Sequence, residues 1–553
     1  MALRLRARLQ SAALVLACLS GAALAQPPQQ QPAQAQPAEA PKFDILEFDV
    51  AGNTVLPDAQ IEAVVMPFMG PEHTIADVEA ARAALEKRYQ QAGYLTVFVD
   101  IPEQRVDEGV VHLQVTEGRV ERLSVSGARY YSQGRIRAAA TEVAEGQVPN
   151  FNVVQQQLAT LNRGDTRRVQ PVLKPGVEPG TVDVDLKVDD KLPLGGSIEF
   201  NNNHPAGVDA THVVANLHYD NLFQREHSLS LTLMDTPGHP AQSRVLIAGY
   251  NVPLASGDSI SATLIGSDSN VATLGGTQAL GNGTTFSLRY THPLAATAEV
   301  WQAFSFGADY KDLQEQTVFG SSNISTPLRY VPLQVAYNGG YGADPWISQW
   351  GLTLTYGFAP LFQRDVPTCP SANGGSLSQD QFACKRAGAD GSFTSAKLDL
   401  RQTLVSSLGQ FSLRMSGQLA NEPLENSEQF VLGGADTVRG YYESAALGDS
   451  GLLGGFEWRY DLAPAMRRQA GDAASRNLRE FTVLAFTEGG RVYTQNALPG
   501  SPIHETLASA GVGLRLQTTS GLSISLDYAH AMKPLSGQAT PSALVHLKLG
   551  QKL

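Results

Sequence analysis

Apolar and polar residues alternate with a period of two over most of the chain from residue 194 to the C-terminus. Leu229, Leu231 and Leu233, for example, alternate with serine and threonine. The same alternation recurs in further segments, which include 259–264, 286–290, 411–416, 522–528 and 545–549. Because successive side chains of a β-strand point to opposite faces, each segment predicts a strand with one apolar and one polar face.

No helical segments separate these strands, so two architectures remain: a soluble sandwich and a barrel that spans a membrane. The length of the region and the small polar residues on its wet face favour the barrel, with about sixteen antiparallel strands over residues 192–553. Connections also alternate in length. Residues 253–258 and 517–521 are short turns, whereas 358–391 and 420–451 are long loops, the asymmetry typical of outer-membrane barrels.

Residues 43–190 show a different pattern, which repeats once. Val50–Thr54 is echoed by Val125–Arg129, and Gly109–Val115 is echoed at a similar offset by Gly180–Leu186. Two copies of one unit are therefore predicted, at 43–118 and 119–191, each with the order strand, helix, helix, strand, strand.

The first copy shows how the elements are assigned. Val78, Ala81, Leu85 and Tyr89 fall at helical spacing and predict a helix that Gly93 ends. Small mixed modules of this kind expose strand edges, to which an extended polypeptide can add by main-chain hydrogen bonds. Two spacer domains are the alternative interpretation.

The first 42 residues predict export. Arg4, Arg6 and Arg8 precede an apolar stretch, and Ala23-Leu24-Ala25 offers a cleavage site, so residues 1–25 are predicted to be a signal peptide. Cys18 lies in the apolar stretch, which leaves a lipoprotein as the alternative. Residues 26–42, mostly Gln, Pro and Ala, predict a linker without an amphipathic helix.

Composition and cysteine usage narrow the class further. The formal net charge of −12 does not favour nucleic-acid binding. Beyond the N-terminus no run of about 18 apolar residues predicts a transmembrane helix. Cys369 and Cys384 lie within one loop of an exported chain, which favours a disulfide over two free thiols.

The loop 420–451 contains the stretch Leu432–Tyr441, whose centre is Val438, Arg439, Gly440 and Tyr441. An arginine cannot lose its charge, so inside a barrel it needs a carboxylate partner. Glycines and tyrosines beside it suit a loop tip that folds back and packs. The alternative is an ordinary glycine-rich surface loop.

Together these features resemble the two-partner secretion transporters (TpsB), the family that exports haemolysins and filamentous haemagglutinins. The repeats resemble POTRA domains, and Leu161-Asn162 followed by 172–176 and 179–181 matches the second POTRA of that family. The resemblance implies a fold of α+β POTRA modules followed by an all-β transmembrane barrel.

The resemblance also implies a site. The loop 420–451 folds into the lumen, and Arg439 meets an acidic residue on a late strand. The family motif for that strand, Phe-x-Asp-x-Gly, corresponds here to 486–490, with Phe486 and Gly489 beside Glu488 as the expected partner. Glutamate in place of aspartate is one departure from the family. A C-terminal leucine in place of phenylalanine and the absence of an N-terminal plug helix are two more.

The implied function is a protein-conducting pore in the bacterial outer membrane, with its POTRA domains in the periplasm. They would bind an unfolded exoprotein of haemolysin, adhesin or haemagglutinin type, and the barrel, a monomer in lipid, would pass it outward in an extended state. No catalytic, metal, cofactor or nucleotide motif is found. The main alternative is a barrel-assembly or insertase relative, whose arrays of modules are longer; an enzyme and a passive porin explain the repeats less well.

Overall fold

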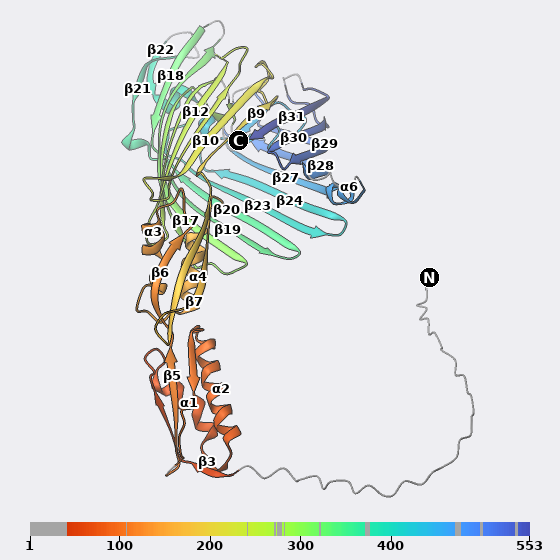
Figure 1. Cartoon of the computed structure of the whole chain (residues 1–553). Helices are drawn as coiled ribbons and strands as arrows, with labels where there is room; N and C mark the ends of the chain where they lie inside the picture. Colours follow the sequence, from red (N-terminus) through yellow and green to blue (C-terminus); the bar gives the residue numbers. More distant parts are fainter. Residues whose placement is uncertain are drawn as a thin grey trace, which may run out of the picture. The chain divides into compact units, whose positions relative to one another are not determined.

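The computed structural model describes residues 41–106, 108–240, 242–269, 272–273, 279–280, 282–319, 322–370, 376–386, 388–469, 477–497, 501–536 and 540–553. The predicted signal peptide, and all of the predicted linker except its last two residues, lie outside this part, so the expectation about a plug helix does too. The chain forms two compact units (Figure 1). The first contains the whole first repeat, the second contains the whole barrel, and the second repeat is divided between them.

The first repeat is a small α+β module. Its elements are β1 (Phe43–Ile45), β2 (Glu47–Ala51), α1 (Asp58–Val65), η1 (Met66–Phe68), β3 (Gly70–His73), α2 (Ile75–Gln91), β4 (Val97–Asp100) and β5 (Val110–Glu117). Strand β5 is central in the sheet, parallel to β2 and antiparallel to β4. The predicted stripe of Val78, Ala81, Leu85 and Tyr89 is the buried face of α2.

Both ends of α2 follow from local chemistry. Thr74 and Asp77 form a capping box, in which the Thr74 amide donates to Asp77 Oδ2 at 2.7 Å. That amide, together with the Thr74 hydroxyl, lowers the pKa of the Asp77 carboxyl. At the other end Gly93 takes a φ of +101°, a conformation that favours glycine and ends the helix as predicted.

The second repeat has the predicted order of strand, helix, helix, strand and strand, and in its described residues, 119–191, β1 and β3 have no counterparts. Its elements are β6 (Arg119–Ser126), α3 (Gln133–Ala139), η2 (Thr141–Val143), α4 (Phe151–Leu161), β7 (Arg167–Pro175) and β8 (Thr181–Asp190). Its three-stranded sheet has the order β6-β8-β7.

The rest of the chain closes into an antiparallel barrel (Figure 1). Its strands are β9 (Leu194–Asn201), β10 (His212–Leu222), β11 (His227–Asp235), β12 (Ser243–Pro253), β13 (Ser259–Ser269), β16 (Gly283–Pro293), β17 (Val300–Phe319), β18 (Ser322–Tyr330), β19 (Leu333–Ala343), β20 (Trp346–Tyr356), β23 (Thr394–Ser406), β24 (Gly409–Ala420), β27 (Ser450–Asp461), β28 (Leu478–Tyr493), β29 (His504–Thr518), β30 (Leu522–Ala531) and β31 (Ala543–Lys552). Closure occurs where β31 pairs with β9.

Two of these strands continue one another. Tyr330 of β18 pairs with Lys311, and Leu333 of β19 pairs with Ala308, so both follow a single register along β17. Pro332, which has no amide hydrogen to donate, interrupts them. Counted as one strand, β18 and β19 give a wall of sixteen strands over the described residues, which confirms the predicted number.

Short elements occupy the connections. They are β14 (Ala272–Thr273), β15 (Ala279–Leu280), η3 (Ala359–Leu361), β21 (Asp365–Pro370), β22 (Ser376–Asp380), α5 (Gln381–Lys385), η4 (Asn426–Glu428), β25 (Phe430–Leu432), β26 (Ala446–Gly448) and α6 (Ala463–Gln469). The turns predicted at 253–258 and 517–521 join β12 to β13 and β29 to β30, while 358–391 and 420–451 contain the longer loops.

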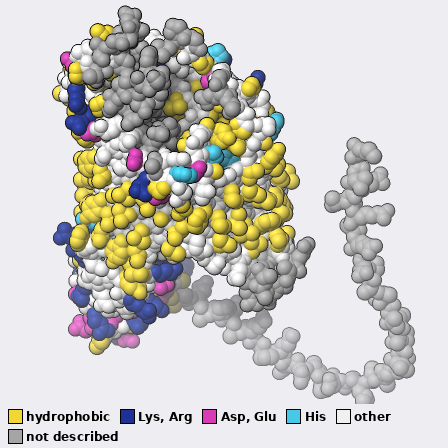
Figure 2. Space-filling view, turned by 90° about the horizontal axis from the view of Figure 1, so that it is seen from above, with side chains coloured by type: hydrophobic (Ala, Val, Ile, Leu, Met, Phe, Trp, Pro, Cys, Tyr) yellow, Lys and Arg dark blue, Asp and Glu magenta, His cyan; other side chains and the backbone are white. Residues whose placement is uncertain are grey.

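The apolar residues of the alternating segments point outward. Figure 2 shows hydrophobic side chains gathered in a broad band over the visible face of the barrel. Exposed members of this set include Leu229, Leu231, Leu233, Leu264, Phe286, Leu288, Leu413, Met415, Tyr528, Val545, Leu547 and Leu549. An apolar surface of this extent is stable only against lipid, so the polar faces of the same strands line the lumen. No described helix is long and apolar enough to cross a bilayer.

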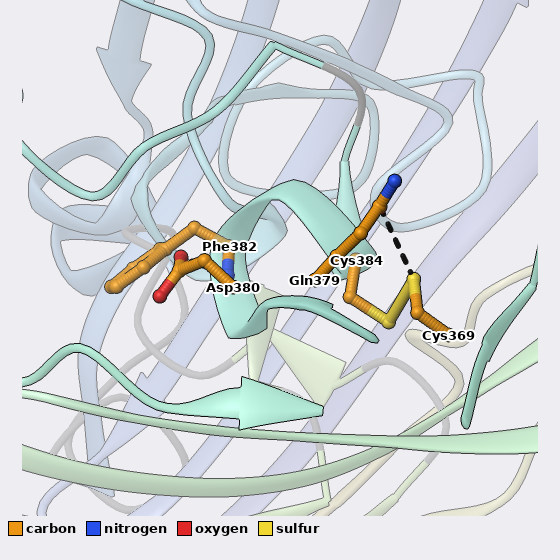
Figure 3. Close-up of a disulfide and its surroundings, with 5 residues drawn as sticks. All are labelled: Cys369, Gln379, Asp380, Phe382 and Cys384. Carbon is orange, nitrogen blue, oxygen red and sulfur yellow. Dashed lines mark hydrogen bonds between the residues drawn. A yellow bond between two sulfur atoms is a disulfide. The ribbon is translucent and has the colours of Figure 1, made fainter. Parts of the chain in front are cut away.

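The predicted disulfide is present. Cys369 of β21 and Cys384 of α5 are bonded, with their Cα atoms 5.4 Å apart (Figure 3). At the N-terminus of this short helix, the N-cap residue Asp380 accepts a hydrogen bond from the Phe382 amide at 2.9 Å. Phe382 is fully buried in an apolar cluster with Leu424, so this loop packs against the base of the next long loop.

A buried ion pair reinforces that packing. Arg386, two residues after Cys384, makes a bidentate contact with Asp449, at 2.5 Å from Nη1 to Oδ1 and 2.6 Å from Nη2 to Oδ2. The Asp449 carboxylate is fully buried and also accepts from the amides of Leu424 and Gln495. The disulfide loop is therefore tied to the end of loop 420–451.

Arginine at an outward position should destabilise the barrel and arginine at an inward position should not. Leu288, 48% exposed, lies at the centre of β16, and Leu288→Arg should cost about 2–4 kcal/mol at the bilayer midplane. The matched control is Ser287→Arg, because Ser287 lines a lumen cavity that also contains Asp309. Urea unfolding in lipid vesicles measures the difference, and equal losses in the two variants would contradict the assigned faces.

Loss of the disulfide should loosen α5. A crosslink across a separation of 15 residues is worth about 3 kcal/mol of loop entropy. In the double variant Cys369→Ser/Cys384→Ser, trypsin should therefore cut after Lys385 or Arg386 faster than in the parent protein. Cleavage after Arg163, in the second repeat, is the internal control and should not change. Equal rates at the loop would show that other contacts hold it.

Candidate functional site in the barrel lumen

Loop 420–451 turns back into the barrel. Its stem is a hairpin in which β25 pairs with β26, and its tip contains the residues between these strands. The tip contacts Arg414, Glu457, Glu488, Asp527 and His546. These five side chains alternate with lipid-facing residues along their strands, so they face the lumen and the loop lies within it.

Apolar side chains anchor the tip. Val438 and Tyr441 have no exposed surface and pack with Leu432, Leu453 and Leu507. The Tyr441 hydroxyl also lies 2.7 Å from the Lys533 carbonyl and 3.0 Å from the Ala508 carbonyl. A fully buried phenol whose hydroxyl is hydrogen-bonded has a fixed position and a fixed ring orientation.

A glycine allows the backbone to turn sharply at the tip of the loop. Gly440 has a φ of +94°, and its amide donates to His546 Nε2 at 3.0 Å. A Cβ added at Gly440 would lie 3.2 Å from both the Cβ and the carbonyl oxygen of Ala529. The motif therefore needs glycine for conformation and for space, directly after its arginine.

Arg439 is surrounded by three carboxylates. Its Nη2 lies 2.7 Å from Glu488 Oε1 and 2.7 Å from Glu457 Oε2, and its Nη1 lies 3.5 Å from Asp527 Oδ2. The Arg439 amide also donates to Glu488 Oε2 at 2.9 Å. The side chains of Arg439 and Glu488 are only 7% and 6% exposed, so this is a buried charge cluster. A buried guanidinium is stable only with such partners.

Each of the three carboxylates has a second cation on the wall. Glu488 also contacts Arg414 at 3.3 Å, Glu457 contacts Arg459, and Asp527 holds Arg515 in a bidentate pair at 2.7 Å. These second cations belong to β24, β27 and β29, so they do not depend on the loop. Each of the three carboxylates is therefore neutralised partly by Arg439 of the loop and partly by an arginine of the wall.

The structure brings the predicted pair Arg439 and Glu488 together. Phe486 lies under the same guanidinium, whose Cζ is 3.4 Å from the ring centroid. Gly489 follows Glu488 and so belongs to the opposite face of β28, where it contributes no side chain. Cys369 and Cys384 lie in the disulfide loop, outside this cluster.

Sequence reasoning missed several members of the cluster. Glu457, Asp527 and Arg414 all occupy polar positions of alternating segments, which was the available signal. Their proximity depends on strand register: Gly455 lies between Arg414 and Glu488 in one row across the wall. Without a side chain at that position, Arg414 can reach Glu488 across β27.

Comparisons with known proteins agree with this architecture. The family model for the ShlB-type POTRA domain matches residues 43–118, and that for the haemolysin secretion/activation protein ShlB/FhaC/HecB matches 373–516, which includes the in-folded loop. The outer membrane transporter CdiB of Dickeya dadantii is 24% identical over 494 residues, which cover 86% of this chain and 81% of the relative.

These matches confirm the resemblance to the two-partner secretion transporters. The structure of CdiB from Escherichia coli has the same fold, with a TM-score of 0.65 at 19% identity over 95% of this chain and 93% of that one. BamA from Haemophilus ducreyi, lacking POTRA domains 1–3, matches with a TM-score of 0.53 at 14% identity, over 92% and 100%. The transporter lies in the outer membrane with its POTRA domains in the periplasm.

Substitution of Gly440 should release the tip of the loop in the transporter. In Gly440→Ala the positive φ costs roughly 1–2 kcal/mol and the new Cβ presses on Ala529. Faster amide hydrogen exchange should follow over residues 430–448, measured by mass spectrometry. Gly454→Ala is the matched control, because a Cβ there meets nothing within 4 Å. Unchanged exchange in Gly440→Ala would refute the requirement for glycine.

Proposed function

We propose that this transporter is a protein-conducting pore that secretes a partner exoprotein of haemolysin, adhesin or haemagglutinin type. The exoprotein passes from the periplasm to the cell surface in an extended state. The observation that carries the proposal is the loop held in the lumen by Arg439: a closed barrel with a polar interior contains an in-folded segment anchored by ion pairs. The likeness to a secretion protein family and to an outer membrane transporter supports the direction of transport.

In this proposal the POTRA modules receive the unfolded exoprotein. Strand β4 is one edge of the first three-stranded sheet, and β7 is one edge of the second. Both edges carry exposed apolar side chains: Phe98 on β4, and Val172 and Leu173 on β7. An added strand gains main-chain hydrogen bonds at such an edge, and the apolar side chains beside it contribute contacts without demanding a specific sequence.

The motif residues then share one role, which is to fix the loop in the lumen. They are Val438, Arg439, Gly440, Tyr441 and their partner Glu488. Arg439 provides the charge, Tyr441 and Val438 the packing, and Gly440 the turn. Loss of the loop's position would change the cross-section of the lumen where the loop lies. Transport therefore depends on a loop with one defined position.

An insertase function is the alternative with the same fold. The likeness to BamA is one of fold alone, at 14% identity. By contrast, the relative that aligns over 86% of this chain is named as an outer membrane transporter. Two POTRA-like repeats also fit the secretion family better than the longer arrays of assembly proteins.

Secretion should fail when the central cation is removed. Arg439→Ala leaves Glu488 and Glu457 without their loop partner, and breaking a buried pair costs roughly 3–5 kcal/mol. Secretion of the partner exoprotein should fall on the order of tenfold or more, assayed by immunoblot of the culture medium.

Two controls make that result specific. Outer-membrane insertion of Arg439→Ala, tested by heat-modifiable migration, should remain normal. Arg244→Ala removes an arginine that is half exposed and pairs only with Asp235 among the described residues, so its secretion should match the parent protein. Secretion by Arg439→Ala at the parent level would refute the role of the loop.

A further inference from the structure

Two cavities lie between the in-folded loop and the barrel wall, and they differ in charge. The larger, of about 700 Å³, is lined by five arginines and three carboxylates. The smaller, of about 400 Å³, is lined by three cations and three carboxylates. Asp527 and Lys548, which contact Arg515 and Asp436 of this lining, add one charge of each sign. The larger cavity therefore has an excess of two positive charges, whereas the smaller one is neutral.

The charged residues that line the smaller cavity all form ion pairs with one another. Arg289 lies 2.6 Å from Asp309, Lys311 lies 2.5 Å from Glu428, and Lys397 lies 3.9 Å from Asp399. Every charged group there has an opposite partner on the protein itself. That cavity offers no unsatisfied charge to anything that enters it.

The larger cavity contains a cation without such a partner. Arg401 of β23 has no ion pair or hydrogen bond within the described part of the chain, and its side chain is exposed to the lumen. Its direct neighbour across the sheet on β24 is Arg414, another cation. Like charges in directly opposite positions destabilise a sheet, so this arrangement is not explained by stability.

Arg414, unlike Arg401, already has partners on the loop and on β28. Its Nη1 donates to the Asp436 carbonyl and its Nη2 to the Thr437 carbonyl, both at 2.6 Å. Arg459, near the end of β27, has one ion-pair partner among the described residues, Glu457, which it shares with Arg439. Arg401 and Arg459 therefore present free or half-used guanidinium groups to the cavity.

We propose that this cavity is an anion-binding face of the conducting path. This inference rests on the proposed function. The ligands of the cavity are the carboxylate side chains of the polypeptide in transit. A guanidinium presents a planar fork of donors that matches a carboxylate. Because Arg401 is exposed to water, each contact is weak, and an acidic segment can pass from one arginine to the next without arrest.

Ion selectivity tests the charge of this face. The purified transporter is inserted in a planar lipid bilayer with a KCl gradient, and the reversal potential is measured. The parent protein should prefer chloride, Arg401→Gln should move the reversal potential toward zero, and Arg401→Glu should reverse its sign. Lys397→Gln is the matched control: it removes a cation four residues away on the same strand, in the paired cavity.

Block of the current by an acidic peptide tests whether the cavity binds the carboxylates of a polypeptide or only small anions. A short polyglutamate peptide added on the POTRA side should block the current several-fold longer than polyglutamine, and Arg401→Gln should abolish the difference. An equal shift of the reversal potential in Lys397→Gln would overturn the proposal. So would a shift in Arg401→Gln without any change in polyglutamate block, which would mark a site for small anions only.

These measurements need no exoprotein, so they separate this inference from the proposed function. Normal secretion by Arg439→Ala would refute the role of the loop. It would not affect the ion selectivity of the parent pore, which is measured without exoprotein. Heat-modifiable migration of Arg401→Gln confirms that the variant is folded before its current is recorded.

Discussion

The buried guanidinium of Arg439 is the constraint on which the interior of this barrel depends. A charge removed from water must meet opposite charge, and the loop tip can satisfy it only where Glu488, Glu457 and Asp527 converge. This requirement fixes the depth of the loop in the lumen. Tyr441 and Val438 then pack in a position that the ion pairs have already defined, and Gly440 permits the turn between charge and packing.

The same carboxylates also belong to the wall. Arg414, Arg459 and Arg515 each hold one of them from a strand, so the wall is partly neutralised without the loop. This arrangement anchors the loop strongly. It also limits the unpaired negative charge that would remain on the wall if the loop left the lumen. It also explains why the lumen beside the loop has an excess of arginine rather than a balance of charges.

A second buried carboxylate, Asp449, stabilises the opposite end of the loop. It joins Arg386 of the disulfide loop to the amides of Leu424 and Gln495, which mark the base of the in-folded segment and the end of β28. The loop is thus held by a salt bridge at its tip and by another at its base. The segment between them has apolar contacts and main-chain pairing within β25 and β26.

The amino-acid sequence alone determined the periodic features. Alternation of apolar and polar residues predicted the strands and their lipid-facing side, helical spacing predicted α2, and two cysteines in one loop predicted the disulfide. These features are local, because the period of a strand or helix is set by neighbouring residues. The pair of Arg439 and Glu488 was also expected, but from a family motif rather than from local pattern.

Tertiary structure alone decided which charges meet. Glu457, Asp527 and Arg414 looked like ordinary polar positions of their strands, and Arg386 and Asp449 had no signal in the sequence. Their partners are set by strand register and by the path of two long loops, and a register shift of one residue would turn each side chain to the other face. Such contacts join residues far apart in the chain, so the energy that selects them is absent from any local segment.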